Sequence, residues 1–219
     1  MDLETGLPSY ADGFFDLAIV DPPYGIGRDR EEESTSSHGG RRAYTVKTWD
    51  SQPPPKEYFE QLFRVSRNQI IWGANYFPQN LMPSMGWILW DKGQRIAQSD
   101  GELAFTSFQK ALRVATLNRC YIKDQGNGQH PTQKPVRLHR WLLENYAKQG
   151  DKILDTHVGS ASSLVVYEEM GFEYVGYELD PDYYRDSCKR LEAFRAQPKL
   201  FSGGEIFEAS KQPIQGSLF

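Results

Sequence analysis

Short apolar segments alternate with amphipathic helical stripes along most of this chain, and this alternation limits its fold more than any other feature. The segment 17–20 is a continuous apolar run bounded by turn residues, as expected of a strand buried on both faces. The stretch 135–150 instead carries apolar residues at helical spacing and ends in Gly150, a helix stop. Strands that alternate with helices of this length predict an α/β fold with a mostly parallel, twisted sheet and helices on both faces. Further strands are expected at 68–73, 86–93, 101–108, 152–155 and 173–180, and further helices at 56–66, 160–171 and 181–194.

Length and composition predict one folded unit with a tail. The chain has 219 residues, and we expect one domain over 1–196 followed by a flexible tail over 197–219. Residues 28–47 are polar and charged, with glycine and serine, and predict a long mobile loop. The formal net charge of −4 gives no support to a nucleic-acid partner, although a local basic surface can act within an acidic chain.

Targeting signals and cysteine usage predict a cytoplasmic protein. No apolar run approaches the length of a membrane span, and the first residues lack the charged and apolar regions of a signal peptide. Cys120 and Cys188 are the two cysteines, and they show no metal-ligand spacing. We therefore expect reduced thiols in a cytoplasmic setting.

The motif Asp21-Pro22-Pro23-Tyr24 follows the first apolar strand directly. Asp21 is expected at the carboxyl end of that strand, where open α/β sheets bind their ligands. The two prolines fix successive φ angles and remove two backbone donors, so the turn is stiff and holds Tyr24 close to the Asp21 carboxylate. An ordinary proline-rich turn gives the same local pattern, so this motif alone leaves both interpretations open.

The unit over 152–180 predicts a site for an adenosine-containing ligand. Gly159 and Ser160 lie at the turn between strand and helix, where free backbone N–H groups face the carboxyl edge of the sheet. Glu178 follows Asp155 by 23 residues, at the place where such folds hold a ribose diol. The G-x-G-x-x-G fingerprint is absent, which argues against NAD. A plain βαβ unit with a helix-packing glycine is the alternative.

Three motifs, in one order, resemble the S-adenosyl-L-methionine-dependent amino-methyltransferases of DNA. They are DPPYG at 21–25, HPTQKP at 130–135 and DTHVGS at 155–160. The catalytic motif comes first and the cofactor motif last, which resembles the circularly permuted beta subgroup, and the stretches IIWGANYF, WILWDKG and GELAFTSF resemble its small phage or prophage members. The resemblance spans roughly residues 14–195 and implies a Rossmann-like methyltransferase fold, S-adenosyl-L-methionine as cofactor and DNA as partner.

The resemblance also implies roles for particular residues. Asp21, Pro22, Pro23 and Tyr24 would be catalytic, with Asp21 accepting a hydrogen bond from the target amino group and Tyr24 stacking on a base turned out of the duplex. The residues implied for cofactor binding are Asp21, His130, Pro131, Thr132, Asp155, His157, Gly159, Ser160 and Glu178.

The cofactor turn departs from the family pattern. Thr156, His157 and Ala161 stand where the pattern has Pro, Phe and a second Gly. His157 either packs over the cofactor or fills the phenylalanine site. Lys134, in the HPTQKP motif, either pairs with a carboxylate or is solvated.

Basic residues outside the three motifs are the candidates for DNA contact. They are Arg28, Arg41, Arg42, Lys47, Arg113 and Arg119. The first four lie in the mobile loop over 28–47, which either faces DNA or is simply solvated. The region in which larger relatives recognise their target is short here, so we expect a short target, relaxed specificity or help from a second subunit in a homodimer. The four histidines do not cluster at ligand spacing, and no metal site is expected.

Aspartate at position 21 favours the N6 amino group of adenine as the methyl acceptor, because N4-cytosine enzymes of the family more often have serine there. An N4-cytosine DNA methyltransferase is one alternative, and a protein-glutamine methyltransferase of the release-factor type is another. A catalytically silent DNA-binding relative with a weakened cofactor turn belongs to a different functional class.

The last five residues, QGSLF at 215–219, resemble the peptide by which bacterial proteins dock on the DNA polymerase sliding clamp. In that interpretation Gln215 fixes the orientation, and Leu218 and Phe219 enter an apolar pocket. A chance match, or a terminal Leu-Phe that covers an edge of the core, is the alternative.

Overall fold

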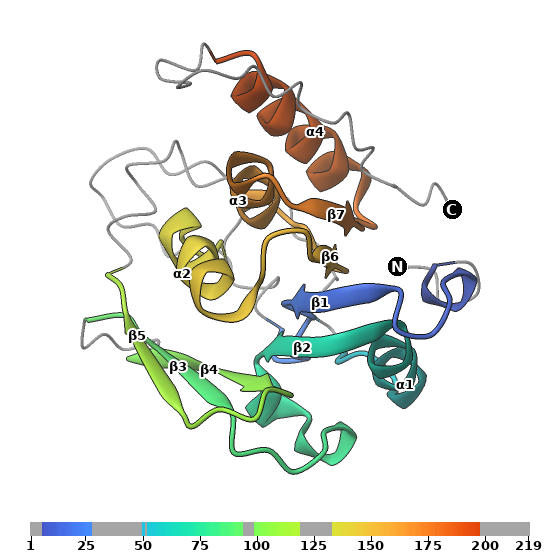
Figure 1. Cartoon of the computed structure of the whole chain (residues 1–219), viewed down its shortest axis with the longest axis vertical. Coiled ribbons are helices and arrows are strands. Elements are labelled where there is room, and N and C mark those ends of the chain that lie inside the picture. The colour runs from blue at the N-terminus through green and yellow to red at the C-terminus, as the bar shows by residue number, and fades with distance from the viewer. Residues whose placement is uncertain (1–5, 28–49, 51, 94–98, 119–132, 198–219) are drawn as a thin grey trace.

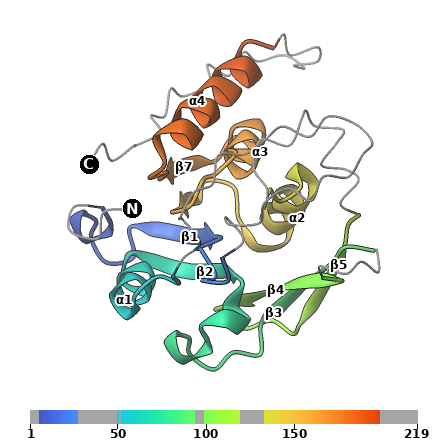
Figure 2. The same cartoon turned by 180° about the vertical axis from the view of Figure 1, so that it is seen from behind.

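A computed structural model describes residues 6–27, 50, 52–93, 99–118 and 133–197, and Figures 1 and 2 show it from two opposite sides. These residues form one seven-stranded sheet in the order β5-β3-β4-β2-β1-β6-β7. The strands are β1 (Phe15–Val20), β2 (Ser66–Trp72), β3 (Trp87–Asp91), β4 (Gly101–Thr106), β5 (Arg113–Thr116), β6 (Lys152–Asp155) and β7 (Glu173–Gly176). The helices are α1 (Lys56–Val65), α2 (Val136–Tyr146), α3 (Ser162–Met170) and α4 (Pro181–Arg195), with 3-10 turns η1 (Leu7–Ser9), η3 (Ala74–Tyr76) and η4 (Pro78–Asn80).

The sheet is mostly parallel, as the alternation of strands and helices predicts. β4 runs antiparallel to both of its neighbours, β2 and β3, and every other adjacent pair in the sheet is parallel. The carboxyl ends of β1, β2, β3 and β6 therefore meet at one edge, and the reversed β4 brings its first residues to that same edge. In the register, Glu102 of β4 lies opposite Trp90 of β3.

Each face of the sheet packs on a different set of helices. One core joins Ile19, Ile70 and Trp72 of the sheet to Leu142 of α2 and Leu164 of α3. The other core is formed on the opposite face, where the strands meet α1 and η1 (Figures 1 and 2). At about 25 cal/mol per Å² of apolar surface, burial on both faces is the main stabilising contribution. Helices on both faces were expected from the sequence, and the two cores confirm them.

The helix ends follow local chemistry. The carboxylate of Asp180 caps α4 by accepting hydrogen bonds from the N–H groups of Asp182 (2.9 Å) and Tyr183 (3.1 Å), and Pro181 occupies the first turn. Gly171 ends α3 in the left-handed conformation with φ of 74°. Ala161, at the start of α3, also has a positive φ, of 59°. The family pattern has glycine at this position, which is the residue type that adopts such a φ most easily.

The expected strands and helices agree with the structure to within about two residues at their ends, except at two ends, and the structure adds one strand. The expected strand over 173–180 ends at Gly176, because the chain turns toward the Asp180 cap. The expected helix over 135–150 ends at Tyr146. The strand Arg113–Thr116 was not expected, since it is short and buries only Ala115 against the core, which leaves no apolar run to detect.

The described helices include none that is long and apolar enough to cross a membrane. The predicted loop over 28–47 and nearly all of the predicted tail over 197–219 lie outside the described residues.

Candidate active site

A buried aspartate holds the turn that follows β1. Asp50 is 2% exposed, and its Oδ1 accepts hydrogen bonds from the N–H groups of Tyr24 (2.7 Å) and Gly25 (2.9 Å). These are the first backbone donors after the two prolines, so one carboxylate oxygen fixes the whole turn. A Cβ on Gly25 would lie 2.6 Å from Cδ of Pro53, which explains why glycine stands there.

Tyr24 lies beside Asp21, as the stiff turn predicts. Its hydroxyl donates a 2.7 Å hydrogen bond to Oδ1 of Asp21. Burial, and then the negative charge of Asp21, raises the pKa of Tyr24 well above its usual value, so the hydroxyl stays protonated and donates. The ring of Tyr24 stacks on that of Tyr76, with centroids 5.0 Å apart and planes 15° from parallel. The ring also packs against Gly73, where a Cβ would lie 2.0 Å from Cε1 of Tyr24.

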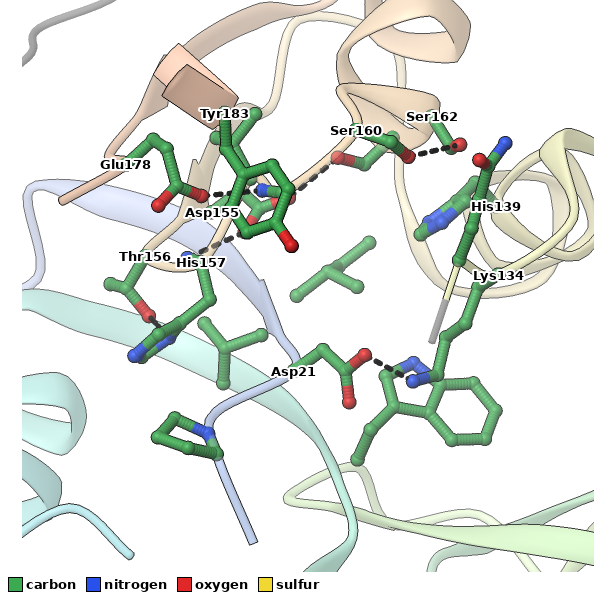
Figure 3. A pocket seen from close by; sticks show the side chains of 18 of the residues that line it. Asp21, Lys134, His139, Asp155, Thr156, His157, Ser160, Ser162, Glu178 and Tyr183 are labelled. Atoms are coloured by element: carbon green, nitrogen blue, oxygen red, sulfur yellow. Dashed lines mark hydrogen bonds and ion pairs between the residues drawn. The ribbon is translucent and has the colours of Figure 1, made fainter. Parts of the chain in front are cut away.

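The other oxygen of Asp21 contacts a buried lysine. Nζ of Lys134 forms an ion pair with Oδ2 of Asp21 (Figure 3). The same Nζ lies 3.4 Å from Oε2 of Glu102, whose Oε1 is 2.8 Å from Nζ of Lys92. The side chains of Lys134 and Lys92 are 4% and 3% exposed. Lys134 thus pairs with carboxylates, which settles the choice that the sequence left open.

Lys134 and Glu102 are the two inner members of the row formed by Lys92, Glu102, Lys134 and Asp21, and both are stabilised in their ionised forms. Burial by itself lowers the pKa of Lys134, but the carboxylates of Asp21 and Glu102 outweigh burial and raise that pKa. Burial by itself raises the pKa of Glu102, but the two lysines outweigh it and lower that pKa below its ordinary value.

Glu178 closes the other side of the site. Its Oε2 accepts a hydrogen bond from the N–H of Gly159 (2.8 Å), and its Oε1 accepts one from the N–H of Asp180 (2.9 Å). Burial raises the pKa of Glu178, although these two backbone donors act in the opposite direction. Each oxygen keeps a free lone pair, so the carboxylate can still accept hydrogen bonds from a ligand.

Asp155 shapes the turn between β6 and α3. Its Oδ1 accepts the N–H of His157 (3.0 Å), and its Oδ2 accepts the hydroxyl of Ser163 (2.6 Å). Burial raises the pKa of Asp155 to about 6, despite these two hydrogen bonds. Both oxygens are thus engaged within the protein, so Asp155 fixes the backbone on which Gly159 presents its N–H group.

His157 is tied to α1 by a polar chain. The hydroxyls of Tyr58 and Thr156 are 2.7 Å apart, and Oγ1 of Thr156 is 2.9 Å from Nδ1 of His157. The rings of His157 and Tyr58 meet edge to face at 5.6 Å. Burial lowers the pKa of His157 to about 3, so the imidazole is neutral. His157 lines the cavity and packs on Tyr58, and its packing over the cofactor stays a prediction.

A cavity of about 230 Å³ connects these groups. Figure 3 shows Glu178 on one side of it and Lys134 on the other, with Asp21 between β1 and the cavity. Nε1 of Trp72 and Nδ1 of His139 are buried against this cavity and have no hydrogen-bond partner within the described part of the chain. The residues that line the cavity include Asp21, Pro23, Trp72, Lys134, His139, Asp155, His157, Gly159, Ser160, Glu178 and Tyr183.

The polar groups that line the cavity fit S-adenosyl-L-methionine. Glu178 offers acceptors for a ribose diol, and the Asp21 carboxylate lies across the cavity, where it would face the positively charged methionine end. The unpaired Nε1 of Trp72 is a buried group that a polar ligand atom would satisfy. Among the described residues, no group of three or more His, Cys, Asp or Glu side chains could hold a metal ion.

The structure brings together most of the predicted site residues that lie in the described part of the chain. Asp21, Pro23, Asp155, His157, Gly159, Ser160 and Glu178 line one cavity. Pro22 is buried beside them, and Tyr24 contacts the site by donating its hydroxyl hydrogen bond to Asp21. Arg113 is exposed on the edge strand β5. Outside the described residues lie Arg28, Arg41, Arg42, Lys47, Arg119, His130, Pro131 and Thr132, together with Gln215, Leu218 and Phe219 of the expected clamp peptide.

Sequence reasoning missed Lys92, Glu102 and Asp50. Lys92 follows the apolar run WILWD, and Glu102 stands at the start of GELAF, so each is a charged residue beside a buried strand. The charge beside a buried strand was a signal that the sequence offered. A charged group in such a place is rarely buried without a partner, so it indicates an ion pair. Asp50 carries no such signal, since it adjoins none of the strands that the sequence predicts.

Comparison with known proteins agrees with this geometry. The model of the N6/N4 family, described as DNA methylase, matches residues 71–189. The Type II methyltransferase M2.DpnII of Streptococcus pneumoniae is 41% identical over 177 residues, which are 78% of this chain and 56% of that protein. This chain therefore spans little more than half the length of that relative.

Two solved structures share the fold at low identity. The M1.HpyAVI–SAM complex superposes with a TM-score of 0.53 at 17% identity, covering 81% of this chain and 89% of that one. The PvuII DNA methyltransferase, described as cytosine-N4-specific, gives a TM-score of 0.55 at 14% identity and covers 90% and 84% of the two chains. Both likenesses support the Rossmann-like methyltransferase fold.

Proposed function

This chain belongs to the N6/N4 family of DNA methylases, and from that premise we propose that it methylates the N6 amino group of adenine in DNA. The observation that carries the proposal is the Asp21 carboxylate, which Tyr24 and Lys134 hold at the wall of the cavity that Glu178 borders on its other side. An acceptor for an amino group and a site for the cofactor thus share one cavity.

The cofactor is S-adenosyl-L-methionine, which supplies a methyl group on a positively charged sulfur. We assign its ribose to Glu178 and the backbone turn at Gly159. The carboxylate of Asp21 is then available to accept a hydrogen bond from the amino group of the base, close to the side of the cavity that we assign to the methionine part of the cofactor.

Asp21 acts on a poor nucleophile. The lone pair of an exocyclic amino group is delocalised into the base, so the nitrogen is planar and unreactive. When Asp21 accepts a hydrogen bond from one N–H, it favours the pyramidal nitrogen and fixes the direction of the lone pair. The N–C bond then forms as the C–S bond breaks, the electron pair of that bond stays on sulfur, and the surplus amino proton leaves to solvent. Asp21 therefore serves as a fixed acceptor in an in-line transfer.

The base has to leave the duplex to reach Asp21, because its amino group is inaccessible within the stack. Tyr24 and Tyr76 form an aromatic pair beside Asp21, and Tyr76 is 43% exposed. A flipped base can extend or exchange with this stack, which places its edge next to the carboxylate.

Adenine is favoured over cytosine by the residue at position 21, since aspartate is associated with adenine enzymes in the resembling family. Methylation of N4 of cytosine by the same geometry is the second candidate. The described residues contain one candidate DNA contact from the sequence, Arg113, which is exposed on β5.

The test is direct. The full chain is incubated with methyl-labelled S-adenosyl-L-methionine and plasmid DNA, and the DNA is digested to nucleosides and separated. We expect the label in N6-methyldeoxyadenosine, and its rate of incorporation should fall by at least about 100-fold with the Asp21→Ala protein. Label in N4-methyldeoxycytidine would replace adenine with cytosine as the acceptor. Cofactor binding without any labelled nucleoside would point to the silent DNA-binding alternative.

A further inference from the structure

A row of four charged side chains leads from the antiparallel strands β3 and β4 to the proposed acceptor, Asp21. Its order is Lys92, Glu102, Lys134 and Asp21, with neighbouring groups in ion-pair contact. The members come from the end of β3, the start of β4, the segment before α2 and the end of β1, so four separate elements meet at this point. Lys134 contacts Asp21 directly, and Glu102 and Lys92 follow behind it; all three lie outside the DPPY motif.

We propose that Lys134 is a positioning residue that fixes the Asp21 carboxylate for its amino substrate, and that Glu102 and Lys92 hold Lys134 in place. This inference rests on the proposed methyl transfer. It assigns a role in that reaction to three residues outside the DPPY motif, namely Lys134, Glu102 and Lys92.

The first argument is the orientation of the carboxylate. Rotation about the terminal torsion of an aspartate is broad and roughly two-fold, so a single contact leaves its oxygens free to move. Here each oxygen has its own donor, the Tyr24 hydroxyl on Oδ1 and the Lys134 ammonium on Oδ2. Two donors on opposite oxygens define the plane of the carboxylate, and the remaining lone pairs face in fixed directions toward the cavity.

The second argument is the location of the ammonium group itself. Lys134 is 5% exposed, and an ammonium buried to this extent needs compensation from paired charges. Asp21 provides one negative charge and Glu102 the second, while the face of Trp72 lies 5.1 Å from Nζ. These contacts on three sides leave Lys134 little freedom to swing away from Asp21.

The third argument is the balance of charge among these four side chains. Two lysines face two carboxylates, so Glu102 can attract Lys134 without adding net charge beside Asp21. Lys92 is 3% exposed and packs 5.2 Å from the ring centroid of Trp90, which fixes the far end of the row. Without Lys92, the full charge of Glu102 would act on Lys134 and draw it from Asp21.

Lys134→Met tests the proposal, because methionine keeps much of the side-chain length and removes the charge. We expect kcat for methyl transfer to DNA to fall by at least about 100-fold, since a small displacement of a reacting group has that effect. We expect the Kd for S-adenosyl-L-methionine, measured by calorimetry, to stay within about threefold of the wild-type value, well short of one lost contact. Lys134→Arg should recover at least about tenfold of the lost rate by restoring the charge.

Two further variants separate positioning from general support of the fold. Glu102→Gln keeps the shape but removes the anion that holds Lys134, and it should lower kcat by about tenfold without weakening cofactor binding. If thermal melting shows that the Lys134→Met protein is unfolded, the kcat of the Glu102→Gln protein becomes the test of the proposal. Lys152→Met is the matched control, because Lys152 also has an acidic partner (Glu173, 3.3 Å) and an aromatic ring (Phe14, 4.5 Å), but lies outside the cavity. It should keep the wild-type kcat.

Several results would overturn the proposal. One is a folded Lys134→Met protein with wild-type kcat, and another is a wild-type kcat for Glu102→Gln. A third is a large rise in Kd for the cofactor with an unchanged rate at saturation, which would make Lys134 a cofactor ligand. If the wild-type protein itself transfers no methyl group to DNA, the proposed function fails, and this outcome is distinguished by the nucleoside assay before any variant is made.

Discussion

The hydroxyl of Tyr24 donates a 2.7 Å hydrogen bond to Oδ1 of Asp21, across the two prolines that separate them. The contact depends on a third position, because the ring of Tyr24 occupies the space in which Gly73 would carry a Cβ. Gly73 follows β2 directly and has φ of 65°. The geometry of the proposed catalytic turn is therefore set partly by a glycine from the neighbouring strand.

Gly73→Ala should displace Tyr24 from Asp21. The new Cβ would lie 2.0 Å from Cε1 of the tyrosine, so the ring has to move. We expect kcat for methyl transfer to fall by at least about tenfold, because misplacement of a reacting group is costly. The Kd for S-adenosyl-L-methionine should change little, since Gly73 does not line the cofactor cavity. Steady-state kinetics and calorimetry measure the two quantities.

Gly171→Ala is the matched control for this variant. Gly171 has a similar φ of 74°, but the nearest atom to its Cβ would be 3.8 Å away, on Gln149. Both substitutions carry the left-handed backbone cost of about 1–2 kcal/mol, and only Gly73→Ala adds the clash with Tyr24. Equal activity of the two variants would contradict the proposed role of the Tyr24 position.

Glu178→Ala should weaken cofactor binding. The carboxylate is proposed to accept the ribose hydroxyls, and hydrogen bonds to a charged group contribute about 1.5–3 kcal/mol each. We therefore expect the Kd for S-adenosyl-L-methionine to rise by at least about tenfold. Glu178→Gln, which keeps one acceptor oxygen, should fall between alanine and wild type. An unchanged Kd in the folded alanine variant would place the ribose elsewhere.

Asp155 should make the stability of the protein depend on pH. Burial raises its pKa from 3.8 to about 6 in the folded state, so the folded protein binds a proton more tightly than the unfolded chain. The contribution of Asp155 to stability is therefore fully present below pH ~4 and is lost as the pH rises through ~6. At about 1.4 kcal/mol for each pKa unit, the loss amounts to roughly 3 kcal/mol at neutral pH.

Asp155→Asn removes this titration. The free energy of unfolding of the variant, relative to wild type, should increase between pH 4 and pH 7, because only the wild type loses the contribution of Asp155 there. Urea unfolding at a series of pH values measures the difference. A difference that stays constant over this range would contradict the raised pKa of Asp155.

The sequence predicted the parallel core of the sheet and its helices, because each of those elements buries a continuous apolar run or stripe. The resemblance to the methyltransferase family implied that Asp21, Asp155 and Glu178 would share a site, and in the structure all three line one cavity. Strand β5 could not be predicted in this way, because it buries one side chain, Ala115, and leaves its other positions exposed.

The row of charged side chains beside Asp21 shows what the sequence could not indicate. Lys134 and Asp21 are separated by 113 positions, and their pairing depends on how α2 approaches the sheet. The contact between Glu102 and Lys92 depends on the reversed direction of β4, which brings its first residues to the ligand edge. Local propensity carries no information about the pairing of Asp21 with Lys134, whereas Lys92 and Glu102 each stand beside a predicted strand, where a charged residue was the available signal.

Asp21→Ala tests the central claim most directly, when methyl transfer to DNA and cofactor affinity are measured on the same preparation. We expect the rate of transfer to fall by at least about 100-fold, as for the loss of a fixed electrostatic contact, with only a modest rise in the Kd for S-adenosyl-L-methionine. Asp12→Ala is the control, since Asp12 also pairs with a cation, Arg64, but its side chain is 83% exposed, and this variant should keep full activity. Wild-type turnover in the Asp21→Ala protein would contradict the assignment of Asp21 as the acceptor for the amino group.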